Sequence, residues 1–193
     1  MIDRRAQITI TLLLLAIFGL GLYAIHLKHR AEVLPQERIA ARPIAPPAAG
    51  PPQTITFWVA SDKDDLLHKR TASLVLPAEP DLRAREILQT LVAIYTDKDS
   101  PHPLAAGAEI TDVFLLNGTA VLNANGPFAD GHRSGILVEE LTVASLAQTL
   151  AANMPGVARV KILVQGKERD TLAGHVDLTG FYNLSGDPWP TAQ

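Results

Sequence analysis

The residues that could carry out catalysis in this chain are charged and imidazole side chains near its C-terminal end. His175 with Asp177, and Asp170 with Lys161, combine a base or nucleophile with a possible partner. A hydrolase needs such groups within hydrogen-bonding distance of each other. Apolar and polar residues alternate along 157–178, which predicts a hairpin with these four side chains on its solvent face. We therefore expect cross-strand charge pairs, each contributing a few tenths to about 1 kcal/mol, rather than a catalytic set.

Two short runs contain residue types that bind metal ions: Asp62, Asp64 and Asp65, and Asp97, Asp99 and His102. The first run lacks the central glycine and the distal bidentate glutamate of a calcium-binding loop. The spacing of the second run does not orient its side chains toward one ion, and two prolines break the segment 97–106. We predict solvated loops at both places, and neither a metal ion nor a cofactor.

Composition and charge argue against other classes of function. The 17 Lys and Arg residues are balanced by 20 Asp and Glu residues, and the basic residues are scattered along the chain. The His132-Arg133 pair is too small a basic group to indicate an anion site. Without a basic surface, and with few aromatic residues for base stacking, we expect no nucleic-acid partner. The chain has no cysteine, which excludes disulfides, thiolate metal sites and a cysteine lipid anchor.

The hydrophobic pattern predicts the elements that must position these residues. In chain order it predicts strands at 54–60 and 73–76, a helix at 82–96 with Asp81 as N-cap, a hairpin at 110–123, a helix at 134–153 and a hairpin at 157–178. Polar connections are expected at 61–70, 97–106 and 126–135. Asn117-Gly118 suits a type I′ turn, because both residues tolerate positive φ. The order β-β-α-β-β-α-β-β predicts an α+β domain, a mixed β-sheet with two main helices packed on it.

The predicted helix at 134–153 has a broader apolar surface than one packing face requires. Val143, Ala147 and Leu150 extend its apolar arc, and no charged residue occurs from position 141 to 158. Either the helix is buried between two layers, or one face is kept for a partner or another copy of the chain. Burial is the more common outcome, and the second interpretation makes these three residues a possible interaction face.

The N-terminal part has the pattern of a membrane anchor followed by a tether. Residues 8–27 contain no Asp, Glu, Lys or Arg, and a helix of about 20 residues spans roughly 30 Å, the hydrocarbon thickness of a bilayer. A cleaved signal peptide is the alternative, but this apolar run is longer than is usual there and no small-x-small cleavage site follows. The predicted organisation is a cytoplasmic tail 1–7, a transmembrane helix 8–27, a linker 28–53, a domain 54–180 and a tail 181–193. The linker is rich in proline and alanine, which is typical of a semi-rigid spacer.

The orientation of this predicted helix follows from its position more than from its charges. Arg4 and Arg5 precede it and Lys28 and Arg30 follow it, so the positive-inside rule is nearly balanced. A short basic N-terminal tail before a long C-terminal domain is typical of a signal anchor. We therefore predict a single-pass protein of the cytoplasmic membrane, with its N-terminus in the cytoplasm and its domain outside.

Several residues also resemble a known family. The resemblance is carried by Ser145-Leu146, Thr149-Leu150, Pro155-Gly156-Val157, the run 160–164 and Gly166-Lys167, with Gly107, Ile110, Val113, Asn117-Gly118 and Val121 before them. In order and spacing these residues are similar to the GerMN domain, a module named from a sporulation and germination lipoprotein of spore-forming bacteria. The resemblance implies an extracytoplasmic α/β module without recognised catalytic residues. This chain departs from that lipoprotein in having one module and a predicted membrane helix in place of a lipidated cysteine, so the sporulation role is not carried over.

The expected function is that of a non-catalytic interaction or scaffold module in the bacterial cell envelope. Its expected partners are the membrane and either an envelope protein or another copy of the chain. A cell-envelope hydrolase and a small-ligand-binding domain are the alternatives. A hydrolase requires a concave pocket with two titratable groups, whereas a flat, exposed position of His175 and Asp177 excludes that pair as its active site.

Overall fold

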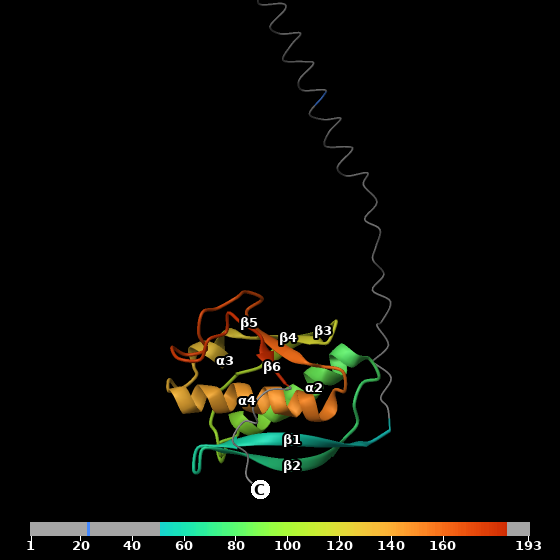
Figure 1. Ribbon diagram of the computed structural model, residues 1–193, viewed down its shortest axis with the longest axis horizontal. Coiled ribbons are helices and arrows are strands. Elements are labelled where there is room, and N and C mark those ends of the chain that lie inside the picture. Colours follow the sequence, from blue (N-terminus) through green and yellow to red (C-terminus); the bar gives the residue numbers. More distant parts are fainter. Residues whose placement is uncertain (1–22, 24–50, 185–193) are drawn as a thin grey trace, which may run out of the picture. The chain divides into compact units, whose positions relative to one another are not determined.

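The computed structural model describes Tyr23 and residues 51–184, and the latter contain two β-sheets and three helices (Figure 1). The predicted transmembrane helix 8–27 lies, apart from Tyr23, outside the described residues, as do most of the linker 28–53 and of the tail 181–193. Within the described part, no helix has the length and the apolar character needed to cross a membrane.

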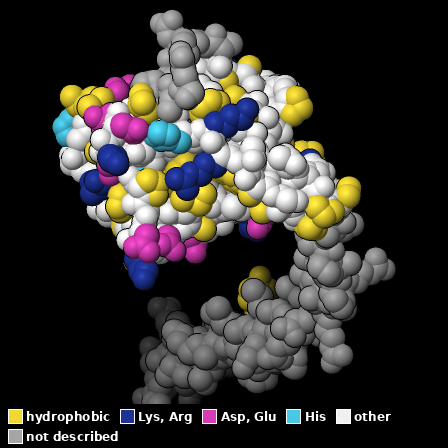
Figure 2. All heavy atoms as spheres, turned by 90° about the horizontal axis from the view of Figure 1, so that it is seen from below, with side chains coloured by type: hydrophobic (Ala, Val, Ile, Leu, Met, Phe, Trp, Pro, Cys, Tyr) yellow, Lys and Arg dark blue, Asp and Glu magenta, His cyan; other side chains and the backbone are white. Residues whose placement is uncertain are grey.

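The first sheet is a two-stranded antiparallel ribbon. A run of β-branched and aromatic residues forms β1 (Gln53–Ser61), and the chain turns back at once into β2 (Leu66–Leu74). The prediction of a strand at 73–76 is wrong in extent, because the strand begins within the expected polar connection 61–70. Polar residues are tolerated in β2 because most of its side chains face solvent. Figure 2 shows this side of the domain, where acidic, basic and imidazole side chains are interspersed.

Helix α2 (Pro80–Thr96) follows the prediction except at its start. Glu79, rather than Asp81, is the N-cap, and its carboxylate accepts hydrogen bonds from the backbone N–H groups of Asp81 and Leu82. The Asp81 carboxylate instead accepts from the backbone N–H of Leu115 at 3.0 Å, which joins the start of the helix to the next hairpin. The predicted apolar stripe is buried, namely Leu88, Leu91, Val92 and Tyr95.

The second sheet has the strand order β3-β4-β5-β6. Its strands are β3 (Ile110–Leu116), β4 (Thr119–Ala124), β5 (Arg159–Val164) and β6 (Tyr182–Asn183). The predicted first hairpin is confirmed, and its turn residues Asn117 and Gly118 have φ values of 49° and 73°. β4 and β5 are parallel, whereas β5 and β6 are antiparallel, so the sheet is mixed as predicted.

The predicted second hairpin, at 157–178, is wrong in its second half. After β5 the chain turns at Gly166, leaves the sheet, and forms only isolated bridges such as Thr171 with Asp177. The strand that pairs with β5 on this side is the two-residue β6. Leu172, Val176 and Leu178 are nevertheless buried, so the alternation indicated which side chains enter the core but not a strand.

A short helix, α3 (Gly126–Asp130), occupies part of the segment expected to be loop. Its N-cap is Asn125, whose side-chain oxygen accepts from the backbone N–H of Phe128 at 3.0 Å. A helix of one turn is too short to show a 3.6-residue hydrophobic period, which is why the sequence pattern does not indicate it.

Helix α4 (Ile136–Asn153) is the centre of the domain, with the β1–β2 ribbon on one side and the four-stranded sheet on the other (Figure 1). Its polar residues bond to β1, because Thr149 Oγ1 accepts from the N–H of Trp58 and Asn153 Oδ1 from that of Thr56, both at 3.0 Å. The possible interaction face lies in the core, since Val143, Ala147 and Leu150 are 1%, 0% and 0% exposed. Burial between two layers therefore explains the broad apolar arc, and this face is closed to partners in the folded domain.

Candidate functional site

Three polar side chains from distant segments meet inside the domain. Asp62 follows β1, His102 lies in the loop between α2 and β3, and Thr142 is in α4. Asp62 Oδ1 is 2.5 Å from His102 Nδ1, and His102 Nε2 is 2.6 Å from Thr142 Oγ1. The prediction that His102 lies in a solvated loop is wrong, because its side chain is fully buried. The loop is held inward by hydrogen bonds such as that from the backbone N–H of Asp62 to the carbonyl of Pro101, at 2.9 Å.

A second histidine joins the same group. His132 Nε2 is 2.8 Å from Thr142 Oγ1, and its Nδ1 is 2.7 Å from the carbonyl oxygen of Arg133. The Arg133 guanidinium donates to Asp62 Oδ2, so one carboxylate contacts both this guanidinium and His102. The sequence places the two histidines in separate loops without partners, and the structure brings them together. We call Asp62, His102, His132, Arg133 and Thr142 the histidine cluster.

The cluster has the order of groups found in hydrolases, a carboxylate, an imidazole and a hydroxyl. Its hydroxyl is enclosed, because Thr142 is 0% exposed and both histidines are buried. The hydroxyl also contacts the carbonyl oxygen of Val138 in its own helix, at 3.1 Å. Burial lowers the pKa of His102 and of His132. In this structure the hydroxyl is enclosed by the two imidazoles and its own helix, and the cluster joins four segments of the chain.

The predicted pair of His175 and Asp177 does not form. His175 Nδ1 is 2.9 Å from a carboxylate oxygen of Glu139, whereas Asp177 accepts hydrogen bonds from the backbone N–H and the hydroxyl of Thr179. Those bonds hold the pKa of Asp177 below its usual value, with the hydroxyl of Thr179 as the largest cause. His175 and Asp177 are on an exposed loop rather than on a hairpin.

Glu139 is a buried carboxylate that the sequence analysis missed. It is 0% exposed and accepts hydrogen bonds from the backbone N–H groups of four residues, which are Gly135, Ala173, His175 and Val176. Burial acts to raise its pKa, but these bonds and that from the His175 ring outweigh burial and lower the pKa to about 2. One feature of the sequence could have indicated this role. Glu139 is an acidic residue in the first turn of a helix whose N-cap is a glycine, which has no side chain to accept from the backbone N–H groups.

The predicted solvent position of Lys161 is also wrong. Its side chain is buried, and its Nζ donates to the carbonyl oxygens of Leu178 and Thr179 at 3.1 and 2.5 Å. Its ion pair is with Glu168, at 3.1 Å, and not with Asp170. Lys161 therefore fastens the returning chain onto the outer face of β5.

The acidic runs belong to surface turns as predicted, apart from Asp62. Asp64 forms an ion pair with His68 at 2.9 Å, and Asp97 accepts from the backbone N–H of Asp99. Among the described residues, no three or more His, Asp or Glu side chains are placed to hold one metal ion.

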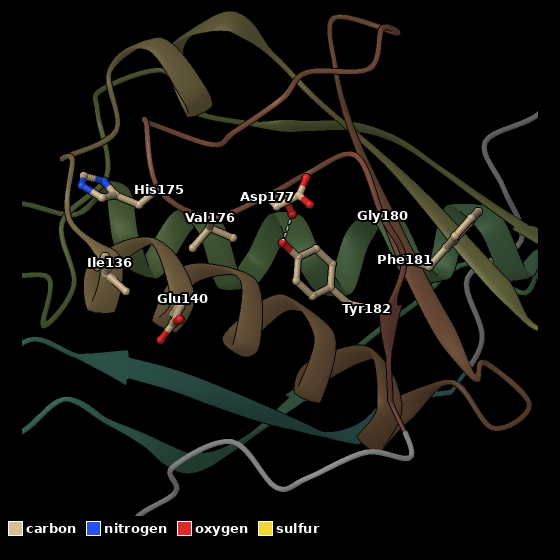
Figure 3. A pocket seen from close by; sticks show the side chains of 8 residues that line it. All are labelled: Ile136, Glu140, His175, Val176, Asp177, Gly180, Phe181 and Tyr182. Atoms are coloured by element: carbon tan, nitrogen blue, oxygen red, sulfur yellow. Dashed lines mark hydrogen bonds between the residues drawn. The ribbon is translucent and has the colours of Figure 1, made fainter.

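An open hollow of about 330 Å³ lies between the start of α4 and the returning chain (Figure 3). Its lining combines apolar, acidic and imidazole side chains, from Ile136, Glu140, His175, Val176, Asp177, Gly180, Phe181 and Tyr182. The Tyr182 hydroxyl donates to the carbonyl oxygen of Asp177, and burial is the largest cause that raises the pKa of Tyr182 to about 12. At pH 7 this tyrosine is thus a neutral hydrogen-bonding group.

A second surface feature is an apolar patch on the face of the four-stranded sheet that points away from α4. Phe114 and Leu116 in β3 are 56% and 67% exposed, and Phe181 is 51% exposed. The Arg159 guanidinium lies 4.5 Å from the centre of the Phe181 ring, and the pairing register aligns Leu116, Thr119 and Arg159 across the sheet. We call Phe114, Leu116 and Phe181 the outer patch.

Comparisons with known proteins agree with this fold. The tandem GerMN domains of the sporulation protein GerM from Bacillus subtilis match at 17% identity over 67% of this chain and 45% of that one, with a TM-score of 0.52. The first GerMN domain of the same protein matches at 15% identity over 68% of this chain and 96% of that one, with a TM-score of 0.49. The tandem structure, at this identity, shows a shared fold alone. The comparison with curated proteins finds no match.

The sequence itself matches one family. Residues 56–170, more than half of the 193-residue chain, fit the family Germane, which is described as "Sporulation and spore germination". The matched range contains all three described helices and both sheets, except for the short β6 and the first three residues of β1. The chain therefore belongs to the Germane family, whose module is the GerMN domain.

Proposed function

We propose that this protein is a membrane-anchored module of the bacterial cell envelope that acts by binding another protein chain and not by catalysis. The observation that carries the proposal is the outer patch, three large apolar side chains exposed on one face of a sheet. Exposed apolar side chains gathered on one face are typical of binding surfaces.

The neighbouring backbone supports the same proposal. β3 is the first strand of the sheet order, so one of its edges has no strand partner among the described residues. Side chains of α2 already accept from two backbone N–H groups of β3, Gln89 from Ile110 and Asp81 from Leu115, both at 3.0 Å. Pairing with a strand of another chain would therefore use only the rest of this edge, beside the exposed apolar side chains.

The buried positions of the polar groups are a second line of support. The carboxylate, imidazole and hydroxyl of the histidine cluster are the groups that a hydrolase would use. The imidazoles and the hydroxyl are buried in the core, and the part of the cluster that reaches the surface is the Asp62 side chain, 24% exposed, with that of Arg133. The apolar segment 8–27 and the proline-rich linker 28–53 support an anchor that holds the domain away from the membrane.

The small-ligand alternative also has one observation in its favour, the hollow lined by Ile136, Glu140 and Phe181 among others. The hollow is open, and its lining combines apolar with acidic and imidazole side chains, so it would suit a small ligand that has both polar and apolar groups.

The test uses the full-length protein in bacterial membranes, with a photo-crosslinking residue at position 114, 136 or 75 in turn. We expect a discrete protein adduct from position 114, with a yield that Leu116→Asp lowers about tenfold, the effect of about 1.4 kcal/mol. Val75 is the matched control, because its exposed fraction of 54% is close to that of Phe114 at 56% but it is not in the patch.

Adducts of equal yield from positions 114 and 75 would contradict the proposal. An adduct from position 136 alone would move the binding surface to the hollow. The mass of the adduct distinguishes a second copy of this chain from a different protein.

A further inference from the structure

The hydrogen bonds of the histidine cluster fix where two of its protons must be. His102 Nδ1 is 2.5 Å from Asp62 Oδ1, an oxygen of a carboxylate that also contacts the Arg133 guanidinium. His132 Nδ1 is 2.7 Å from the carbonyl oxygen of Arg133. A carboxylate and a carbonyl can only accept, so the Nδ1 atom of each histidine carries a hydrogen. In two neutral imidazoles both Nε2 atoms are then bare acceptors.

Both Nε2 atoms face the same oxygen. Thr142 Oγ1 lies 2.6 Å from His102 Nε2 and 2.8 Å from His132 Nε2. A threonine hydroxyl has one proton, and here the carbonyl oxygen of Val138 is a third acceptor at 3.1 Å. With both histidines neutral, at least one Nε2 lone pair faces an oxygen lone pair in the core, which is unfavourable where no water can intervene.

We propose that His102, Thr142 and His132 form a proton-binding site that holds one proton more than two neutral imidazoles, with Asp62 as the counter-ion. With the proton on His132, His132 Nε2 donates to Thr142 Oγ1, and the Thr142 hydroxyl donates to His102 Nε2. With the proton on His102 both bonds reverse, so the hydroxyl relays the proton between the two rings. The proton comes from solvent, and no covalent bond other than N–H and O–H changes.

The charged groups around the rings favour one added proton and oppose a second. Burial lowers the pKa of each ring, while Asp62 acts to raise that of His102, and the Arg133 carbonyl and Glu139 act to raise that of His132. The Arg133 guanidinium opposes protonation of both rings. Tyr95 contacts the His102 ring edge-on at 5.2 Å and is neutral, because burial raises its pKa to about 12.

The two rings therefore take up their protons in two steps that have different pKa values. Burial lowers the pKa of each ring taken singly. The first added proton, however, removes the contact between two lone pairs at Thr142 Oγ1 and completes the hydrogen bonds beside Asp62. This gain is shared by the two rings, and it places the pKa of the first step above the ordinary histidine value of about 6.5. The second would create two cations with ring centres 6.3 Å apart in the core, so its pKa lies below the ordinary value.

The site makes the stability of the domain depend on pH. A first pKa raised on folding gives a stabilisation that is fully present below about pH 6.5 and is lost as the pH rises through the folded value. The groups that hold the proton belong to the β1–β2 turn, the loop before β3, the segment after α3, and α4. Loss of the proton thus loosens four segments together.

The test is a histidine ring spectrum of the full-length protein, labelled with ¹⁵N-histidine and held in detergent micelles. His102→Gln and His132→Gln assign the two signals, and His68→Gln assigns an exposed histidine as reference. At pH 7.5, where an ordinary histidine is about one-tenth charged, we expect the two cluster rings together to carry one charge. Two neutral cluster rings at pH 7.5 would overturn the proposal.

A matched pair of substitutions tests the relay. Thr142→Val keeps the side-chain shape but removes the hydroxyl, so the charged ring should lose its acceptor and both rings should be neutral at pH 7.5. Thr142→Ser keeps the hydroxyl and should keep the charge. The urea midpoint should be higher at pH 6 than at pH 8 in the natural protein, in His68→Gln and in Thr142→Ser. A charged ring that persists in Thr142→Val would show that the hydroxyl does not share the proton.

Discussion

The single residue that fixes most of the backbone around it is Glu139. One carboxylate in the first turn of α4 satisfies four backbone N–H groups, three of them from the loop segment 173–176. A loop that crosses a core without strand partners must find acceptors for its N–H groups, because unpaired buried donors are costly. Glu139 supplies them, and its negative charge is also favoured at a helix N-terminus.

Glu139→Gln should therefore lower the free energy of unfolding at pH 7 by about 1–3 kcal/mol. The amide keeps the shape but loses the charge and places an N–H₂ group against backbone donors. The pKa of Glu139 is lowered to about 2 by folding, so its stabilisation is present above about pH 4.5 and is lost as the pH falls through about 2. Urea unfolding between pH 2 and 7 measures both effects.

The matched control is Glu140→Gln, since Glu140 is the next residue of the same helix and is exposed. It should change stability by less than about 0.5 kcal/mol. Equal effects of the two substitutions would show that the hydrogen bonds to Glu139 are not stabilising.

At the scale of elements, periodic patterns predicted the helices and the first hairpin but not how the chain returns after β5. The alternation of apolar and polar residues at 172–178 correctly indicated which side chains enter the core. The same alternation fits a loop whose backbone N–H groups bond to Glu139 as well as it fits a strand. The wrong positions of His102 and Lys161 have one physical cause. A polar side chain is buried only when a distant segment supplies its partner, and local sequence contains no record of that partner.

One glycine tests how tightly the elements around the histidine cluster are packed. A Cβ atom on Gly131, the residue before His132, would lie 2.5 Å from the Cβ of Ala105 and 2.9 Å from the carbonyl oxygen of Pro127. Gly131→Ala should lower the free energy of unfolding by about 1–3 kcal/mol and shift the ring signals of His102 and His132. Thermal unfolding and the histidine spectrum measure these changes.

Gly180→Ala is its control, because a Cβ there meets no atom within 4 Å. It should leave both the stability and the ring signals as they are. If the Gly131→Ala protein were as stable as the natural one, the loop that contains Ala105 would have to move aside for the added methyl group with no loss of folding stability.

At the scale of the whole molecule, two parts of the chain carry separate conclusions. The described domain is the part that matches the family, and the proposed location in the membrane rests on the N-terminal segment. Composition and hydropathy predicted this division without knowledge of the fold, because a run of apolar residues and a proline-rich spacer are local properties. The surface that would bind a partner cannot be predicted in the same way, because it depends on contacts between distant segments of the chain. The outer patch includes Phe181, which is held at the sheet by the bonds from Lys161 to the returning chain and by the pairing of β6 with β5.

The predicted topology places the C-terminus outside the cytoplasm. A reporter enzyme that is active only after export, fused after Gln193, should therefore be active in intact cells. Deletion of residues 8–27 should abolish that activity, and a reporter that is active only in the cytoplasm should show the opposite pattern. Activity of the cytoplasmic reporter in the undeleted chain would reverse the orientation.

The entry point of the chain into the domain has a mechanical consequence. Any tension transmitted along the preceding linker reaches the fold at Gln53, the first residue of β1. Near this end the Asn153 side chain holds both the N–H and the carbonyl of Thr56, at 3.0 and 2.6 Å. A pull first loads the pairing of the start of β1 with β2 and the hydrogen bond from Arg83 to Gln53. The Asn153 clamp on Thr56 comes next, so the last residue of the central helix resists the separation of β1 from α4.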